Sequence, residues 1–242
     1  MSACKSESAW LAVGALTMLG ALIYLQASRS YRSTSTRSAD SSAALERSPP
    51  TREGVAAAHL SSIVVLLALC SYSAMFVASR LYAHAQVTAI RYLEWAITTP
   101  LLLVELARLT GRASRERRRD PRWLSTVIAL DVAMIALGAV AVYASDVRSK
   151  VAAFVASTAC MLAIFYFLFG PGLFGPSERR STDSRYDRAV LFTTCVWALY
   201  PVVWLLGDHG LGYVSIPCET LGYVVLDSLA KPAFAVIFAN VE

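Results

Sequence analysis

The chain contains seven long apolar runs, and their length limits the fold more than any other feature of the sequence. The runs cover approximately residues 9 to 27, 58 to 80, 87 to 109, 122 to 143, 148 to 172, 184 to 207 and 217 to 240. A hydrocarbon core of about 30 Å takes roughly 20 helical residues per crossing, so each run is long enough to span a bilayer. The runs are continuously apolar instead of alternating, which favours helices over a membrane β-barrel. The sequence therefore predicts an all-α protein with seven transmembrane helices.

The composition agrees with a membrane protein in which the helices form one domain. Of the 242 residues, 56% are hydrophobic and 16% are charged, which lies outside the range of an ordinary soluble domain. Most connections are short, so residues 1 to 242 are predicted to form a single up-and-down bundle around a common interior. The exception is "SRSYRSTSTRSADSSAALERSPPTREG", residues 28 to 54, whose Ser-rich and Arg-rich composition predicts a flexible cytoplasmic loop.

The basic residues predict the orientation of the bundle. The segments after the first, third and fifth apolar runs hold 16 of the 22 Lys and Arg residues. Because cytoplasmic loops collect Lys and Arg, the N-terminus is expected outside and the C-terminus in the cytoplasm. This asymmetry also explains the net charge of +5, so the charge gives no reason to expect a nucleic-acid partner.

The third run, "RYLEWAITTPLLLVELARLTG", carries charged residues at depths where charge is costly. Arg91, Glu94, Thr98 and Glu105 follow one another at i, i+3, i+7 and i+14, which places them on one face of a helix. Glu94 and Glu105 are separated by roughly 16 Å along the helix axis. Ionisable residues in a span usually face the bundle interior and mark a pathway or a cofactor site.

The last run places a lysine near the middle of the membrane. Lys231 lies in "LDSLAKPAF", with Asp227 one turn before it. A desolvated ammonium tends to lose its proton, which suits a lysine for Schiff-base chemistry with an aldehyde. A plain ion pair that ties helices together explains the same spacing, and the spacing alone does not separate the two interpretations.

Aromatic residues in the spans favour a slot for a flat apolar ligand. Trp197, Tyr200 and Trp204 share one face of the sixth run around Pro201, although such a stripe also occurs in ordinary cores. The five cysteines show no CxxC pair, so we expect small core residues and neither a disulfide framework nor a metal site.

The motifs, taken together and in order, resemble those of microbial rhodopsins, the seven-helix retinal proteins of the bacteriorhodopsin type. The resemblance rests on "WLAVGAL", "RYLEWAITTPLLLVEL", "LDVAMIALG", "STACM", "WALYPVVWLLG", "CETL" and "LDSLAK". It implies all-trans retinal covalently bound to Lys231, with Glu94 and Asp227 as counterions and Arg91 as the gate on the outer side. It also implies a set of residues around the retinal: Tyr72, Trp95, Thr99, Asp131, Met134, Gly138, Ser157, Met161, Trp197, Tyr200, Pro201 and Trp204.

The resemblance also implies a path for protons. Glu94 would accept the Schiff-base proton beside Thr98, and Glu105 would supply a new proton from the cytoplasmic side. Outward release would involve Glu219, with Asp208 or His209 as further candidates; His209 is also readily explained as a simple loop residue. The chain departs from the family pattern at Glu94, where outward pumps usually have Asp, and at Pro232, which directly follows the lysine.

The resemblance favours a light-driven outward proton pump, a transporter and not an enzyme. A light-gated cation channel is the second interpretation, although "HLSSIVVLLALCSYSAMFVAS" in the second run contains no carboxylate. A slow photosensor with a signalling partner is the third. The expected surroundings are a lipid bilayer, in particular the plasma membrane, and a homo-oligomer such as a trimer or pentamer.

Overall fold

The computed structural model describes residues 6–38, 52–81, 84–108, 121–169 and 184–239, and these residues are helical apart from short turns. The helices are α1 (Glu7–Ser38), α2 (Arg52–Leu81), α3 (His84–Arg108), α5 (Pro121–Tyr143), α6 (Val147–Phe169), α7 (Ser184–Leu206) and α8 (Ile216–Ser228). Two π-helical segments continue α8, namely η3 (Leu229–Ala233) and η4 (Ala235–Ala239). Within the described ranges, seven helices are long and apolar enough to cross a membrane. The predicted seven-helix, all-α architecture is therefore confirmed, and the chain is an integral, multi-pass membrane protein.

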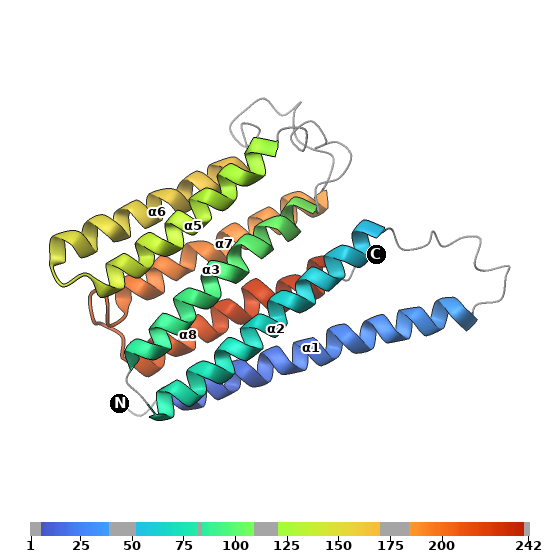
Figure 1. Cartoon of the computed structure of the whole chain (residues 1–242), viewed down its shortest axis with the longest axis horizontal. Coiled ribbons are helices and arrows are strands. Elements are labelled where there is room, and N and C mark those ends of the chain that lie inside the picture. The colour runs from blue at the N-terminus through green and yellow to red at the C-terminus, as the bar shows by residue number, and fades with distance from the viewer. Residues whose placement is uncertain (1–5, 39–51, 82–83, 109–120, 170–183, 240–242) are drawn as a thin grey trace.

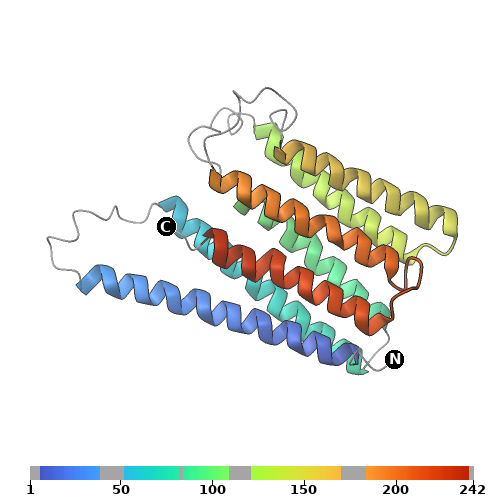
Figure 2. The same ribbon diagram turned by 180° about the vertical axis from the view of Figure 1, so that it is seen from behind.

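The seven helices lie side by side and close into a ring. Each helix packs against the next in the order α1, α2, α3, α5, α6, α7 and α8, and α8 returns to contact α1. Figures 1 and 2 show α5 and α6 at one side of the bundle, α1 and α2 at the other, and α3, α7 and α8 between them. The central helices therefore have the most faces available for an internal site.

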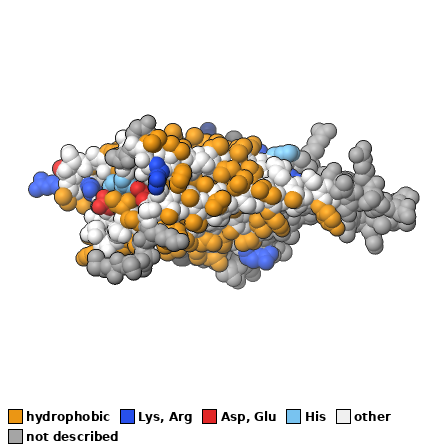
Figure 3. All heavy atoms as spheres, turned by 90° about the horizontal axis from the view of Figure 1, so that it is seen from below, with side chains coloured by type: hydrophobic (Ala, Val, Ile, Leu, Met, Phe, Trp, Pro, Cys, Tyr) orange, Lys and Arg blue, Asp and Glu red, His pale blue; other side chains and the backbone are white. Residues whose placement is uncertain are grey.

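The apolar surface of the bundle is what a bilayer requires. Large side chains such as Leu16, Leu93 and Val155 are more than half exposed, and hydrophobic side chains cover the middle of the face shown in Figure 3. In lipid these side chains lose no solvation, because the surrounding acyl chains are as apolar as a protein core. The helices differ in how much of the membrane-spanning part is buried inside the protein. In an apolar stretch of 18 residues within each span, the buried share is 56% for the last span, Ile216–Ile237, 50% for α3 and 22% for α1.

The sequence misplaced two helix ends at the predicted cytoplasmic loop. Residues 28 to 38 continue α1, and residues 52 to 54 already belong to α2; residues 39 to 51 lie outside the described residues. The prediction of a loop from 28 to 54 was therefore too long. Hydropathy marks where a helix leaves the hydrocarbon, but a helix continues beyond that point because its backbone hydrogen bonds are satisfied within the segment.

The first π-helical segment, η3, contains Lys231 and Pro232, and η4 follows it. The N–H of Phe234 reaches the carbonyl of Leu229, five residues earlier, instead of a carbonyl four residues earlier. Pro232 has no N–H to donate, and a widened turn of this kind is a common way to accommodate a local break in the helical ladder. Lys231 therefore projects from a π-helical turn, which is wider than a turn of regular α-helix.

The cysteines depart from the expectation of small core residues, because Cys70 and Cys195 are exposed and Cys160 is only partly buried. Cys70, Cys160 and Cys195 are free, but Cys218, at the start of α8, is disulfide-bonded, with a partner outside the described residues. The expectation of small core residues without a disulfide was therefore wrong. Spacing in the sequence does not identify which cysteines pair, and hydropathy does not separate the exposed side of a span from its buried side.

Candidate functional site

The site is built around Lys231 of η3. Its side chain is buried, and its Nζ lies 2.6 Å from Oδ1 of Asp227. The same Nζ lies 3.0 Å from Oε1 of Glu94 on α3. The i, i+4 spacing on the last helix brings Asp227 to the lysine, and the packing around α3 brings Glu94. One cation therefore contacts two carboxylates in the interior of the bundle.

The second carboxylate, Asp227, is held by donors from three other helices. The Tyr72 hydroxyl donates to Oδ2 at 2.7 Å, the Tyr200 hydroxyl to Oδ1 at 2.8 Å, and the Trp95 indole N–H to Oδ1 at 3.2 Å. With Lys231, four donors point at this carboxylate. A buried charge is tolerated only with such partners, so Asp227 is a fixed acceptor.

The polar stripe predicted on the third run lies buried on α3. Arg91, Glu94, Thr98 and Glu105 are all at most 3% exposed. Glu94 accepts a hydrogen bond of 2.9 Å from the Thr98 hydroxyl. The Arg91 guanidinium lies over the Tyr223 ring, 4.7 Å from its centroid, and its Nε and Nη2 have no hydrogen-bond partner among the described residues. Glu94 therefore has fewer donors than Asp227, although both contact Lys231.

Glu105 lies at the opposite end of the stripe, against α2. The Ser61 hydroxyl donates a hydrogen bond to Oε1 of Glu105, while Oε2 is buried without a partner among the described residues. Sequence reasoning missed Ser61. The signal was present, because Ser61 and Ser62 are hydroxyl residues within an otherwise apolar stretch of the second run.

An aromatic cavity whose lining includes Lys231 lies between α3, α5, α6, α7 and the last helix, α8 with η3. Ten of the residues predicted to surround a ligand line it: Trp95, Thr99, Met134, Gly138, Ser157, Met161, Trp197, Tyr200, Pro201 and Trp204. Tyr72 and Asp131 do not line it; Asp131 instead accepts a 2.8 Å hydrogen bond from Thr99, which links α5 to α3. Sequence reasoning missed further lining residues, namely Tyr92, Ile135, Phe154, Thr158 and Tyr223.

Glu219 lies near the start of α8, at the end of the site next to the loop between α7 and α8. Its Oε2 accepts the backbone N–H of Asp208 at 2.9 Å, and a Cβ at Gly207 would collide with its carboxyl group. Burial lowers the pKa of the nearby His209 below the ordinary histidine value. Gly207 therefore leaves room for a buried carboxylate beside the loop.

A second histidine at this end was not singled out by the sequence. Nδ1 of His84 lies 2.7 Å from Oε1 of Glu7, which joins α3 to α1. The ring of His84 also stacks with that of His209 at a centroid distance of 6.0 Å. Neither spacing nor hydropathy connects residues so distant in sequence, so this contact required the structure.

Comparison with known proteins decides the family. Residues 5–242 match the family profile described as bacteriorhodopsin-like protein. The chain belongs to the bacteriorhodopsin-like family. Members of this family are light-driven retinal proteins, and they act as ion transporters or photoreceptors.

Individual bacteriorhodopsin-like proteins show how far the similarity extends. Cruxrhodopsin-3 of Haloarcula vallismortis is 40% identical over 158 residues, which is 61% of this chain but only 59% of that protein. Bacteriorhodopsin-I of Haloquadratum walsbyi is 30% identical over 96% of this chain and 85% of its own length. The crystal structure of thermophilic rhodopsin from Rubrobacter xylanophilus, 28% identical, superposes with a TM-score of 0.78 over 97% of this chain and 95% of that chain.

The residues of the cavity fit the retinal that bacteriorhodopsin-like proteins bind. The lining is mainly aromatic and aliphatic, which suits a flat apolar polyene, and it includes Lys231, which carries a primary amine. Two carboxylates contact that amine, so a cation formed there would be compensated. The donor set therefore agrees with a ligand that joins the protein through an amine.

Proposed function

We propose that Lys231 holds all-trans retinal covalently and that this chain is a light-driven outward proton pump. The observation that carries the proposal is the position of Lys231 between Glu94 and Asp227, with Glu105 buried further along the same face of α3. An acceptor and a donor carboxylate on one helix, with the amine between them, supply both ends of a proton path.

Retinal, when bound, supplies light absorption and an isomerisation that reorients the proton on the lysine nitrogen. Glu94 and Asp227 both lie within reach of that proton, but their surroundings differ. The lone pairs of Asp227 are engaged by Tyr72, Tyr200 and Trp95. Glu94 has the Thr98 hydroxyl as its other side-chain donor. Glu94 is therefore the carboxylate better able to receive the proton, whereas Asp227 remains as the fixed charge.

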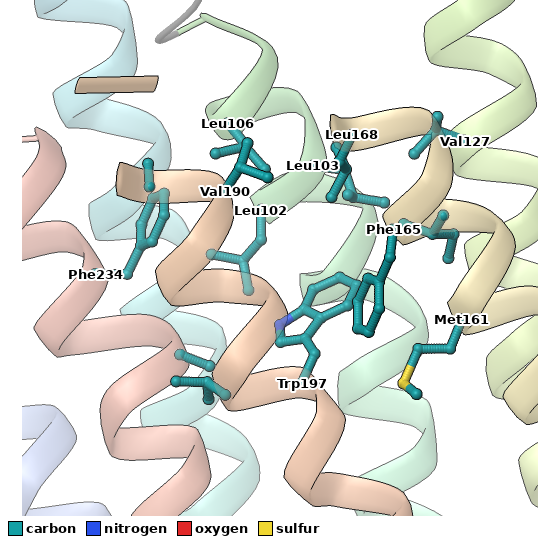
Figure 4. Packing of buried hydrophobic residues seen from close by; sticks show 14 of the residues in the cluster. Leu102, Leu103, Leu106, Val127, Met161, Phe165, Leu168, Val190, Trp197 and Phe234 are labelled. Atoms are coloured by element: carbon teal, nitrogen blue, oxygen red, sulfur yellow. The ribbon is translucent and has the colours of Figure 1, made fainter. Parts of the chain in front are cut away.

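In this proposal, apolar packing between the side chains of Lys231 and Glu105 keeps the two proton-transfer steps apart. Leu102, Trp197 and Phe234 belong to one apolar cluster, and Figure 4 shows their side chains packed between the helices. These three side chains also line a small cavity with mainly apolar walls. Such walls offer water few hydrogen-bond partners, so in this proposal a proton passes only when the interior rearranges. A continuous water path would instead allow ions to leak in either direction, so the packing favours a pump over a channel.

Glu105 acts in this proposal as the internal proton donor. Its Oε2 has no partner in the described part of the chain, so a charge at this position is compensated mainly through Ser61. A buried carboxyl group with so few donors is better accommodated in its neutral form. In its neutral form Glu105 carries the proton that reprotonates the lysine nitrogen.

The direction of transport depends on the orientation of the bundle, with the N-terminus outside. The basic segments after the first, third and fifth helices support this orientation through the positive-inside rule. The disulfide at Cys218 gives independent support. Disulfides persist in oxidising compartments and are rare in the cytosol, so the end of the bundle that holds Cys218 and Glu219 is assigned to the outside. Arg91 and Glu219 then lie on the release side of Glu94.

Light-evoked current under voltage clamp tests the proposal. Cells that express the protein with retinal should give outward current at zero voltage in symmetric solutions. Current that reverses near an ionic equilibrium potential would instead indicate a channel. A photocycle lasting seconds, without current, would indicate a sensor.

The Glu105→Gln variant tests the donor separately. Without a proton to give, the recovery of the protonated chromophore should slow and become dependent on external pH, while the first transfer to Glu94 stays fast. Glu7→Gln is the carboxylate control, because Glu7 lies at the other end of the bundle, in contact with His84. An unchanged recovery rate in E105Q would remove Glu105 as the donor.

Assembly into a trimer or pentamer stays a prediction. Size-exclusion chromatography of the detergent-solubilised protein with light scattering measures the number of subunits. A monomer under these conditions would contradict a stable homo-oligomer.

A further inference from the structure

Gly14 on α1 leaves space for the ring of Tyr72, which contacts the site. Leu11, Gly14 and Met18 share the face of α1 that is turned into the bundle, and all three are buried. A Cβ built on Gly14 would lie 2.5 Å from both Cδ1 and Cε1 of the Tyr72 ring. Carbon atoms pack at about 3.5–4.0 Å, so no side chain fits there while the ring keeps its place.

Tyr72 carries this contact to the counterion. Its side chain is fully buried in the cluster that also contains Leu11 and Met18. One edge of the ring lies against α1 at Gly14, and the hydroxyl donates to Oδ2 of Asp227 at 2.7 Å. The contacts thus run without interruption from Gly14 through Tyr72 and Asp227 to Lys231.

Tyr72 holds a part of the carboxylate that the other donors do not reach. Lys231, Tyr200 and Trp95 all donate to Oδ1 of Asp227. Tyr72 is the side-chain donor to Oδ2 among the described residues. The rotation of the carboxylate about its last bond, and with it the position of its negative charge beside Lys231, therefore depends on the Tyr72 hydroxyl.

From these contacts we infer that Gly14 is a positioning residue for the counterion, acting through Tyr72. The inference rests on the proposed role of Lys231 as the retinal-bearing residue. A methyl group at residue 14 requires a displacement of roughly 1 Å to restore an ordinary carbon contact. The phenol ring is rigid, so a displacement of that size stretches a 2.7 Å hydrogen bond beyond its effective range of about 3 Å.

The Gly14→Ala variant tests the inference, and Gly20→Ala is its matched control. Gly20 lies on the same helix, and a Cβ there meets nothing within 4 Å. We expect G14A, but not G20A, to shift the absorption maximum of the retinal-loaded protein in the same direction as Tyr72→Phe. A Phe at residue 72 keeps the ring and removes only the hydroxyl, so it gives the reference effect even where G14A expresses poorly.

The double variant separates positioning from packing. In a Y72F background the hydrogen bond is already absent, so adding G14A should leave the absorption maximum unchanged while still lowering the thermal stability. If G14A shifts the colour equally in both backgrounds, or if Y72F alone causes no shift, the inference is wrong. A loss of stability in G14A without any change of colour would mean that α1 moves outward and Tyr72 stays in place, which also contradicts it.

A measurement without retinal distinguishes this inference from the proposed function. Ultraviolet resonance Raman spectra of the retinal-free protein report tyrosine hydrogen bonding, and the difference between wild type and Y72F isolates Tyr72. G14A should weaken that signal and G20A should not. A wild-type protein that forms no pigment would contradict the proposed function, whereas an unchanged Tyr72 signal in G14A would contradict the positioning role.

Discussion

The hydroxyl of Ser61 on α2 donates a hydrogen bond to the carboxyl group of Glu105 on α3. If Glu105 is the internal proton donor, as proposed, Ser61 should help to set how readily Glu105 gives up a proton, because the hydroxyl stabilises the anion that remains. A hydrogen bond to a charged group contributes about 1.5–3 kcal/mol. Ser61→Ala should therefore slow the recovery of the protonated chromophore roughly tenfold or more, measured by flash photolysis. Ser61→Thr keeps the hydroxyl and should recover at nearly the wild-type rate; an equal slowing in both variants would contradict the role of the hydroxyl.

Replacement of Glu94 by Gln removes the proposed acceptor and one negative charge beside Lys231. With less negative charge near the cation, the absorption maximum should move to longer wavelength. Light-evoked outward current should fall to background, because the remaining carboxylate, Asp227, is already engaged by Tyr72, Tyr200 and Trp95. Thr98→Val is the control, since it deletes the 2.9 Å hydrogen bond to Glu94 but keeps the carboxylate, and it should retain current. Persistent pumping in E94Q would assign the acceptor role to another group.

The link between Thr99 and Asp131 should contribute to stability and not to proton transfer. The bond of 2.8 Å joins α3 to α5 within the buried part of the bundle. Thr99→Val should lower the free energy of unfolding by about 1–3 kcal/mol, because it leaves a buried carboxyl group without its donor. Thermal loss of the visible band measures this. Asp131→Asn still offers Thr99 an acceptor and should lower the free energy of unfolding by less. A changed photocycle in T99V with unchanged stability would contradict a structural role.

Loop residue His209 should make the stability of the end of the bundle where it lies, between α7 and α8, sensitive to acid. Burial lowers its pKa in the folded protein, whereas an unfolded histidine titrates near about 6.5. Between these two values the unfolded chain binds more protons than the folded one, so stability should decline as the pH falls below about 6.5. His209→Gln should flatten this part of the pH profile of thermal stability. His59→Gln on the exposed side of α2 should not, and identical profiles for wild type and H209Q would contradict the prediction.

Much of the fold followed from hydropathy, because a span must be apolar over a fixed length. The stripe on α3 and the pairing of Asp227 with Lys231 also followed, since helical periodicity fixes which residues share a face. Contacts between helices could not be read in the same way. Ser61 with Glu105 depends on how two helices pack, and periodicity gives no relative rotation of one helix against another.

The predicted ends of helices were less accurate than their centres. Hydropathy placed a loop at residue 28, while α1 continues to Ser38, because an Arg-rich and Ser-rich segment remains helical outside the hydrocarbon. The disulfide at Cys218 was missed for a related reason, since sequence spacing carries no information about the approach of distant segments. The roles of the individual site residues stay predictions until the variants above are measured.

The four buried charged groups at the centre have a further consequence for the energetics of the cycle. Arg91 and Lys231 supply two positive charges, and Glu94 and Asp227 supply two negative charges, all within a buried region. In the proposed step a proton moves from the lysine nitrogen to Glu94, and both of these groups become neutral. The charges of Arg91 and Asp227 remain. The total charge of the cluster is zero before and after this step, so the step itself leaves no excess charge in the low-dielectric interior. In the proposed cycle, light would therefore have to displace only a dipole within a neutral cluster, which requires far less energy than creating an isolated ion in the membrane.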